Sequence, residues 1–403
     1  MVSNKVYIVD GQRTATGSFL GSLKGCGAAK MGAAVVKKLL ERNKLTGAEI
    51  GELIAGNILS AGAGQGPARQ VSIGAGIPRE VPAYSVNMLC GSGLKAVVNA
   101  AAAIRAGDAD LIVAGGVESM SNAPYLIPAK ARQGVKLGDF QTVDHMVHDA
   151  LTDAFSGAHM GVTAENIAES LLIPRAAQDA FAWDSQQKAI AAVDGGAFKD
   201  EIVPVEVTEG KNTFIFEKDE YPNRATSPEK LAALRPAFKK DGTVTAGNAS
   251  GLNDGAAFVL VAGEAAVKKY SLTPMAELVA AGQAGVEPQI MGLGPVPAIA
   301  AALKKAGRKL SDMEYIELNE AFAAQSLGVV KQLAAARGMG ENEILKRCNV
   351  NGGAIALGHP VGASGARILV TLLHILKHRG AGYGLASLCI GGGMGVAVVV
   401  KSM

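Results

Sequence analysis

Short apolar runs alternate along the chain with stretches in which apolar residues recur every three or four positions. The runs Val6–Val9, Glu52–Leu59 and Leu111–Ala114 predict buried strands. The helical spacing within Ala28–Leu40 and Gly91–Arg105 predicts helices between these strands. Strands that alternate with helices in this way indicate a layered α/β fold, with helices on the faces of a sheet.

The alternation stops after residue 121, where prolines and a polar stretch lead into helical and loop-rich sequence. The run Gly255–Ala262 then returns to the pattern of a buried strand. We therefore expect residues 122–251 to form an inserted domain. This insertion divides a first half that is made of residues 1–121 and 252–274.

Residues 275–403 repeat the outline of the first half. We expect these elements in chain order: a strand at Met275–Ala284, a helix at Val296–Ala306, strands at Tyr315–Leu318 and Cys348–Asn351, a helix at Ala366–Lys377, and a terminal hairpin of Leu385–Cys389 with Val396–Val400. The direct sequence similarity between the halves is weak, so the duplication is inferred from the order of the elements.

Composition narrows the class of protein. Hydrophobic residues make up 49% of the chain, enough for a large core, and only 4% is aromatic. The net charge of +3 is too small to indicate nucleic acid or an anionic membrane surface as a partner. No apolar run reaches the length of about 18 residues that a transmembrane helix needs. The first residues resemble neither a signal nor a transit peptide, so we expect a soluble, cytoplasmic enzyme.

The cysteines lie far apart and without CxxC spacing, at Cys26, Cys90, Cys348 and Cys389. This spacing predicts neither disulfides nor a structural zinc site, and we expect no metal. Two of the cysteines occur in glycine-rich turns, LCGSG and CIGGG. The first, Cys90, directly precedes a predicted helix, whose N-terminal N–H groups and dipole favour the thiolate. A buried cysteine next to a helix cap is the structural alternative.

Three further features could belong to a reaction centre. Cys389 precedes a triple glycine whose amides could stabilise an oxyanion, although a tight hairpin would need the same glycines. His359 lies in the glycine-rich segment Gly352–Arg367, where it could act as a base for a thiol. The glycines there would let the backbone approach a substrate closely. Asn319 lies where a strand meets a helix, and could hold a water or cap the helix.

Five segments together resemble the thiolase family, from about Val6 to the C-terminus. They are, in order, NMLCGSGLKAV, GNASGLNDGAA, NEAFAAQ, NGGAIALGHPVGASGAR and LCIGGGMG. The resemblance implies a five-layered αβαβα fold of two similar halves with an inserted loop domain. It is closest to the biosynthetic branch, which condenses two molecules of acetyl-CoA to acetoacetyl-CoA and coenzyme A.

The resemblance also implies roles for individual residues. Cys90 matches the nucleophile that takes the acetyl group, and His359 matches the histidine that activates it and stabilises a thioester oxyanion. Cys389 matches the base that removes the α-proton of the second acetyl-CoA. Asn319 matches the residue that holds a catalytic water in the other oxyanion hole, beside the backbone of Gly391.

The inserted domain is expected to bind coenzyme A, which is a substrate and product, so no cofactor is implied. The residues that match the family's substrate contacts are Leu151, His159, Met160, Phe238, Ala246, Ala249, Ser250, Leu252, Met291 and Phe322. Within Tyr221–Lys230 the sequence departs from the family pattern, and Arg224 is the candidate for a phosphate contact. The resemblance further implies a homotetramer, built as a dimer of dimers.

Several other functions stay open at this point. A degradative 3-ketoacyl-CoA thiolase of broader chain length shares the whole catalytic set. A non-catalytic coenzyme-A-binding protein should lack a catalytic residue, and a ketoacyl synthase typically has one cysteine with two histidines. A Cys/His metal protein is a further alternative, which a metal analysis would reveal.

Overall fold

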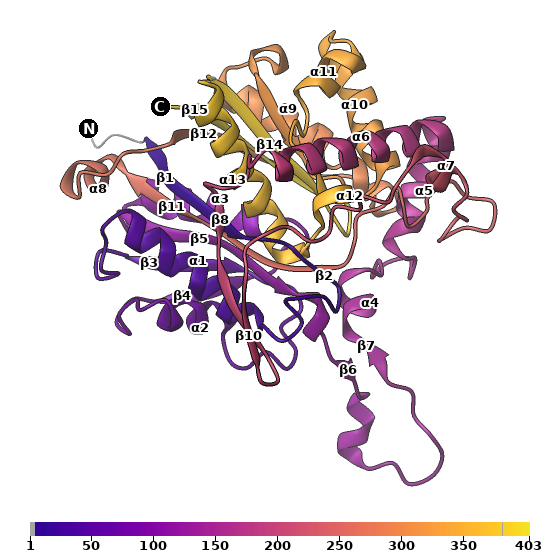
Figure 1. Cartoon of the computed structure of the whole chain (residues 1–403), viewed down its shortest axis with the longest axis horizontal. Helices are drawn as coiled ribbons and strands as arrows, with labels where there is room; N and C mark the ends of the chain where they lie inside the picture. Colours follow the sequence, from indigo (N-terminus) through magenta and orange to yellow (C-terminus); the bar gives the residue numbers. More distant parts are fainter. Residues whose placement is uncertain (1–4, 381) are drawn as a thin grey trace.

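The computed structural model describes residues 5–380 and 382–403, and it has the layered arrangement of strands and helices that the sequence pattern predicts (Figure 1). The last two elements of the first half come after the inserted segment in the chain. Its elements are β1 (Val6–Thr14), β2 (Gly17–Ser18), α1 (Ala28–Arg42), β3 (Glu52–Gly56), α2 (Pro67–Gly74), β4 (Ala83–Val86), α3 (Ser92–Ala106), β5 (Leu111–Ser119), β11 (Asn253–Gly263) and α8 (Glu264–Lys269).

The second half repeats strand and helix in the expected order. Its elements are β12 (Ala276–Gly285), η3 (Pro288–Leu293), α9 (Pro295–Ala306), η4 (Leu310–Asp312), β13 (Tyr315–Leu318), α10 (Ala323–Arg337), α11 (Glu341–Arg347), α12 (Ala354–Leu357), α13 (Val361–Arg379), β14 (Tyr383–Ile390) and β15 (Met394–Ser402). The terminal hairpin is confirmed, because β14 pairs with β15 in antiparallel register.

The strand predicted at Cys348–Asn351 is wrong. Asn349 has a φ of 44°, in the left-handed region, so the chain turns there instead of extending. Its side chain accepts a hydrogen bond from the N–H of Leu318 at 2.9 Å and donates one to the same residue's carbonyl at 2.7 Å. Cys348 forms only an isolated bridge with Ile316, and at Leu318 the asparagine amide supplies the donor and acceptor that a continuing strand would offer.

The segment between the halves carries a projecting arm, formed by β6, η2 and β7, which stands away from the body in Figure 1. Its elements are η1 (Met120–Asn122), β6 (Tyr125–Leu126), η2 (Ala129–Gln133), β7 (Val143–Asp144), α4 (His145–Ala150), α5 (Met160–Ser170), α6 (Arg175–Asp194), β8 (Ile202–Val203), β9 (Val205–Glu209), β10 (Asn212–Phe216) and α7 (Pro228–Ala232). Because β8 pairs with β1 of the first half, the limits of an inserted domain at residues 122–251 stay a prediction.

One hydrogen-bonded path runs through both halves, in the strand order β13-β14-β15-β12-β1-β11-β5-β3-β4. The junction between the halves is short, because β1 and β12 pair only at Tyr7 with Glu277 and Ile8 with Ala276. Every residue of β1, β5 and β11 is buried, as expected for strands covered on both faces.

Helices form three layers around these two half-sheets. Helices α1 and α2 cover the outer face of the first, and α9 and α10 cover the outer face of the second. Helices α3 and α13 fill the space between them. This is the five-layered αβαβα arrangement that was expected. Among the described residues, no helix combines the length and the apolar character that crossing a membrane requires.

Helix α13 is the centre of the molecule, and it begins at Val361, earlier than predicted. Every residue of α13 as far as Leu376 is buried, as expected for a helix between two sheets. A Cβ at Gly93 in α3 would lie 2.9 Å from Ala366 N, and a Cβ at Gly365 would lie 2.5 Å from Leu94 N. Gly365 therefore allows α13 to pack closely on α3, while Gly358 and Gly362 lie against Asn253 and Glu118. These glycines bring the backbone close to other protein atoms, and not to a substrate path as we expected.

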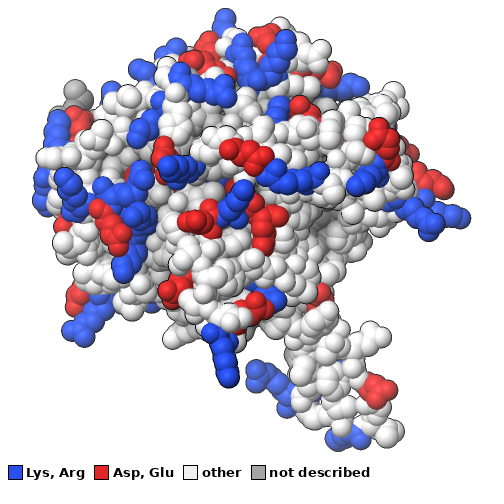
Figure 2. All heavy atoms as spheres, viewed as in Figure 1, with Lys and Arg blue, Asp and Glu red and all other residues white. Residues whose placement is uncertain are grey.

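Charged side chains of both signs are mixed on the surface, while a smaller set that includes Arg13, Glu118 and Arg367 is buried. Figure 2 shows Lys and Arg interspersed with Asp and Glu over the visible face, and both signs are present on the projecting arm. This pattern agrees with the small net charge of +3.

Candidate active site

Cys90 lies in a tight turn between β4 and α3. Leu89 has a φ of 47°, a strained conformation for a residue with a side chain. Ser92 holds the turn, because its N–H and its hydroxyl both donate to the carbonyl of Leu89, at 2.9 and 2.6 Å. The Ser92 hydroxyl also accepts from the N–H of Met88 at 2.9 Å. These bonds fix the backbone that carries the thiol.

The electrostatics of Cys90 differ from the expectation. Burial raises the pKa of its thiol to about 11, and the backbone N–H groups of Gly391 and of Cys90 itself act in the opposite direction. The helix terminus therefore does not favour the thiolate here, because the loss of solvation outweighs these donors. The N–H of Gly391 does reach the sulfur of Cys90, which brings the glycine turn of the second half to the first cysteine.

His359 is 5% exposed and is held at both its backbone and its ring. Its N–H donates to Oδ1 of Asn253 at 2.8 Å, and its Nδ1 lies 2.5 Å from Oγ of Ser364. Since the Ser364 hydroxyl donates to the carbonyl of Pro360 at 2.9 Å, its oxygen is left to accept from Nδ1–H. The lone pair of the neutral ring is then on Nε2, which has no hydrogen-bond partner among the described residues.

The ring of His359 is neutral at physiological pH. Burial lowers its pKa to about 3, and the nearby charge of Arg367 acts in the same direction. The resting pair is therefore a thiol on Cys90 and a neutral imidazole on His359, with Nε2 free to accept a proton.

Cys389 is the penultimate residue of β14 and is 1% exposed. Burial raises the pKa of its thiol far above the ordinary range, and the neighbouring Cys90 contributes to the rise. The turn that follows requires glycine, since Gly392 and Gly393 have φ values of 76° and 86°. The structure thus brings together the two cysteines that the sequence singled out.

Asn319 follows β13 and is 1% exposed. Its N–H donates to the carbonyl of Ser387 at 3.0 Å, but neither side-chain atom has a partner among the described residues. Helix capping does not account for it, because α10 begins at Ala323 with Phe322 at the N-cap position. A buried amide with all its hydrogen-bonding capacity free is suited to hold a water or a substrate oxygen.

A cavity of about 400 Å³ joins Cys90, His359 and Cys389. Its walls also include every predicted substrate contact except Arg224, namely Leu151, His159, Met160, Phe238, Ala246, Ala249, Ser250, Leu252, Met291 and Phe322. The ring of Phe238 stacks on His159 at 4.8 Å between centroids and meets Phe322 edge-on at 6.1 Å. Sequence reasoning missed Met120 and Met146, which also line the cavity and look like ordinary core residues in the sequence.

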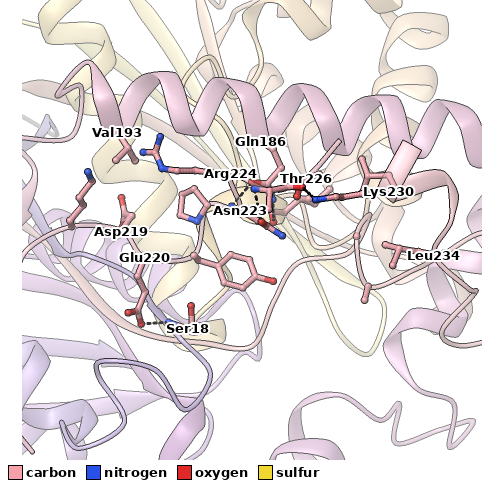
Figure 3. Close-up of a pocket in the computed structure, with 18 residues that line it drawn as sticks. Ser18, Gln186, Val193, Asp219, Glu220, Asn223, Arg224, Thr226, Lys230 and Leu234 are labelled. Carbon is pink, nitrogen blue, oxygen red and sulfur yellow. Dashed lines mark hydrogen bonds between the residues drawn. The ribbon is translucent and has the colours of Figure 1, made fainter. Parts of the chain in front are cut away.

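Asn319, Gly391 and Arg224 lie outside this lining. Arg224 is on the wall of a larger, more polar cavity of about 1010 Å³, which shares Tyr221 and Ala246 with the first. Figure 3 shows Arg224 beneath α6, and its guanidinium pairs with Asp194 at 2.6 Å.

Sequence reasoning missed a second cation on this wall, Lys230, whose ammonium group donates to the carbonyl of Ala225 at 2.6 Å. In the sequence, Lys230 follows the Ser-Pro start of a short helix, and nothing in that pattern indicates a phosphate contact. Within residues 5–380 and 382–403, no group of three or more His, Cys, Asp or Glu side chains is arranged to hold a metal ion.

Comparison with known proteins agrees with this arrangement. Residues 6–265 match the family model of the thiolase N-terminal domain, and residues 272–402 match that of the thiolase C-terminal domain. The chain is 54% identical over 398 residues to an acetyl-CoA acetyltransferase of Pseudomonas aeruginosa, with 98% of each chain covered. It is 53% identical over 396 residues to an acetyl-CoA acetyltransferase of Escherichia coli, again with 98% of each covered.

A solved structure shares the whole fold. The crystal structure of the Bacillus anthracis acetyl-CoA acetyltransferase superposes with a TM-score of 0.95 at 40% sequence identity and covers 100% of both chains. Two consecutive domain models, relatives of the same length and a common fold all lead to one assignment: the chain belongs to the thiolase family.

Proposed function

We propose that the protein is an acetyl-CoA acetyltransferase, an acyltransferase that condenses two molecules of acetyl-CoA to acetoacetyl-CoA and free coenzyme A. The observation that carries the proposal is the single cavity lined by Cys90, Cys389 and the unprotonated side of His359. Full-length relatives that bear the name acetyl-CoA acetyltransferase support the choice of substrate.

In the first half-reaction, the sulfur of Cys90 attacks the thioester carbonyl of acetyl-CoA while Nε2 of His359 takes its proton. Because the resting pair is a thiol and a neutral imidazole, proton transfer accompanies the attack and does not precede it. The bond from the carbonyl carbon to the sulfur of coenzyme A breaks, and acetyl-Cys90 remains. The departing thiolate of coenzyme A takes the proton of Cys389.

In the second half-reaction, the Cys389 thiolate removes the α-proton of a second acetyl-CoA. A thiolate with a strongly raised pKa is a strong base, which this weakly acidic C–H requires. The carbanion attacks the carbonyl of acetyl-Cys90, acetoacetyl-CoA is released, and Cys90 recovers its proton from His359. Every proton is thus accounted for by groups of the site.

Both half-reactions develop negative charge on a thioester oxygen, so each needs fixed donors. Protonated His359 Nε2 serves one oxygen. A water held by the free amide of Asn319 serves the other, together with the backbone N–H of Gly391. These assignments explain why polar atoms stay unpaired in a buried site, where each would otherwise cost free energy.

The larger cavity is proposed to hold the nucleotide part of coenzyme A. It adjoins the acyl cavity at Tyr221, and its charged lining residues are Lys218, Asp219, Glu220, Arg224 and Lys230. The pair between Arg224 and Asp194 is half-exposed, so a phosphate can compete for the guanidinium. Lys230 is the second candidate for a phosphate contact.

We also propose that the protein is a homotetramer in the cytoplasm. The projecting arm exposes large apolar side chains, with Leu137 at 96%, Tyr125 at 68% and Ile127 at 60% exposure. Such a surface is suited to contact another copy of the chain. A reducing compartment fits a mechanism that needs both thiols free. Light scattering after size-exclusion chromatography tests the tetramer.

The test of the proposed activity is mass spectrometry of the protein after exposure to acetyl-CoA, with peptide mapping, followed by an assay of acetoacetyl-CoA formation. We expect one acetyl group, on Cys90, and ping-pong kinetics. An acetyl group on Cys389 and none on Cys90 would contradict the roles assigned here. A clear preference for longer 3-ketoacyl-CoA substrates in thiolysis would favour the degradative alternative.

A further inference from the structure

A buried carboxylate, Glu118 in β5, connects segments from both halves behind the site. Its side chain is 0% exposed. It accepts hydrogen bonds from the N–H groups of Ile58 and Leu59, each at 3.1 Å, and from the side-chain amide of Asn57 at 2.8 Å. It also accepts from the N–H of Gly362 at 2.9 Å. Glu118 therefore joins the loop after β3 to the first turn of α13.

The chemistry of these partners selects an ionised carboxylate. All of them are N–H donors, so the group between them must be able to accept at both oxygens. An amide or a protonated acid would place one of its own donors against them. Gly362 lies in the first turn of a long helix, where N–H groups lack helical partners and negative charge is favourable.

This contact acts on the loop of His359. Gly362 is three residues beyond His359, and Ser364, which holds Nδ1 of the ring, is two residues further along. A Cβ at Gly362 would lie 2.6 Å from Oε2 of Glu118, so the backbone sits directly on the carboxylate. Asn253 provides a second anchor for His359 from the first half.

Activation of the nucleophile does not account for Glu118. Its negative charge raises the pKa of Cys90, which disfavours the thiolate. Burial raises the pKa of Glu118 itself to about 7, whereas the N–H groups of Leu59, Ile58 and Gly362 oppose the rise and Asp254 adds to it. The ionised form of Glu118 therefore works against ionisation of Cys90, and what the carboxylate supplies is the hydrogen bond that holds the first turn of α13.

We propose that Glu118 is a positioning residue for acetyl transfer, whose carboxylate fixes the first turn of α13 and thereby sets His359 Nε2 against Cys90. The two reacting groups, Cys90 and His359, come from different halves. Glu118 links those halves directly through its hydrogen bond from Gly362. The proposal rests on the proposed function, because it takes His359 as the base for Cys90.

The test compares Glu118→Gln with the wild type by rapid-quench mass spectrometry of Cys90 acetylation at saturating acetyl-CoA, together with KM and the melting temperature. We expect acetylation about 100-fold slower, because a displacement of about 1 Å costs that much, with little change in KM.

A matched control is Glu165→Gln. Glu165 is also a buried carboxylate, and it accepts from the backbone N–H groups of Thr243 and Val244, away from the loop of His359. We expect it to lower the melting temperature and to leave the acetylation rate of the folded protein unchanged. Equal slowing in both variants, or a wild-type rate in folded Glu118→Gln, would overturn the proposal.

If Glu118→Gln does not fold, Asn57→Ala removes one of the donors and leaves the carboxylate in place. We expect acetylation to slow by roughly tenfold at unchanged KM, and a wild-type rate would overturn the positioning role. A wild-type protein that acquires no acetyl group on Cys90 would overturn the proposed function itself. That outcome is distinguishable, because it appears before any variant is made.

Discussion

The two cysteine turns look alike in sequence but differ in structure. Cys90 is half-buried and lies ahead of a helix, on a backbone strained at Leu89. Cys389 is almost fully buried at the end of a strand. Burial raises the pKa of both thiols, but only Cys90 receives the N–H of Gly391 as a compensating donor.

The difference indicates a division of labour between the halves. The glycine turn after Cys389 supplies an N–H to Cys90, so the second half completes the site of the first. Both thiols have their own backbone N–H as a donor. The thiol with the additional N–H of Gly391 is suited to attack a carbonyl, and the thiol without that second donor is suited to act as a strong base once deprotonated. Replacing either cysteine by serine tests this division of labour.

The largest effect is expected for Cys90→Ser. A hydroxyl in place of the thiol is a far weaker nucleophile, so acetylation of the protein should fall by at least about 10⁴-fold. Mass spectrometry after exposure to acetyl-CoA measures it, with melting temperature as the control for folding. Undiminished acetylation would show that another residue carries the acetyl group.

A smaller and more selective effect is expected for Cys389→Ser. The variant should still form acetyl-Cys90 but should condense about 10³-fold more slowly, because it lacks the base for the α-proton. Quantifying acetyl-enzyme and acetoacetyl-CoA in the same sample separates the two steps. If both steps fall together, the proposed division between the cysteines is incorrect.

The smallest effect for a single step of change is about tenfold for each pH unit. Since the pKa of Cys90 is raised to about 11, its thiolate fraction should grow about tenfold per pH unit between pH 7 and 10. Alkylation of Cys90 by iodoacetamide, followed by peptide mapping, should rise with the same slope. A rate that is already flat near pH 7 would indicate a thiolate–imidazolium pair in the resting protein.

The sequence predicted much of the fold because local patterns carry it. Periodicity located the strands and helices of both halves, and the family motifs named residues that meet on one cavity. It missed Ser364, Asn253 and Glu118, since each is an ordinary polar residue whose partner lies elsewhere in the chain or depends on the loop geometry. It also read Cys348–Asn351 as a strand, because an asparagine side chain that replaces a strand has no periodic signature.

The sequence by itself determined the order of elements, the family, and which residue types are available for chemistry. The tertiary structure decided the protonation states and the contacts of these residues. A helix N-terminus favours a thiolate locally, but burial between two half-sheets removes water from Cys90 and reverses that preference. Of the glycines around His359, Gly365 serves the contact of α13 with α3, and Gly358 and Gly362 approach Asn253 and Glu118. Only the folded chain supplies these neighbours. Solvation and long-range contact are properties of the whole fold, which no single segment encodes.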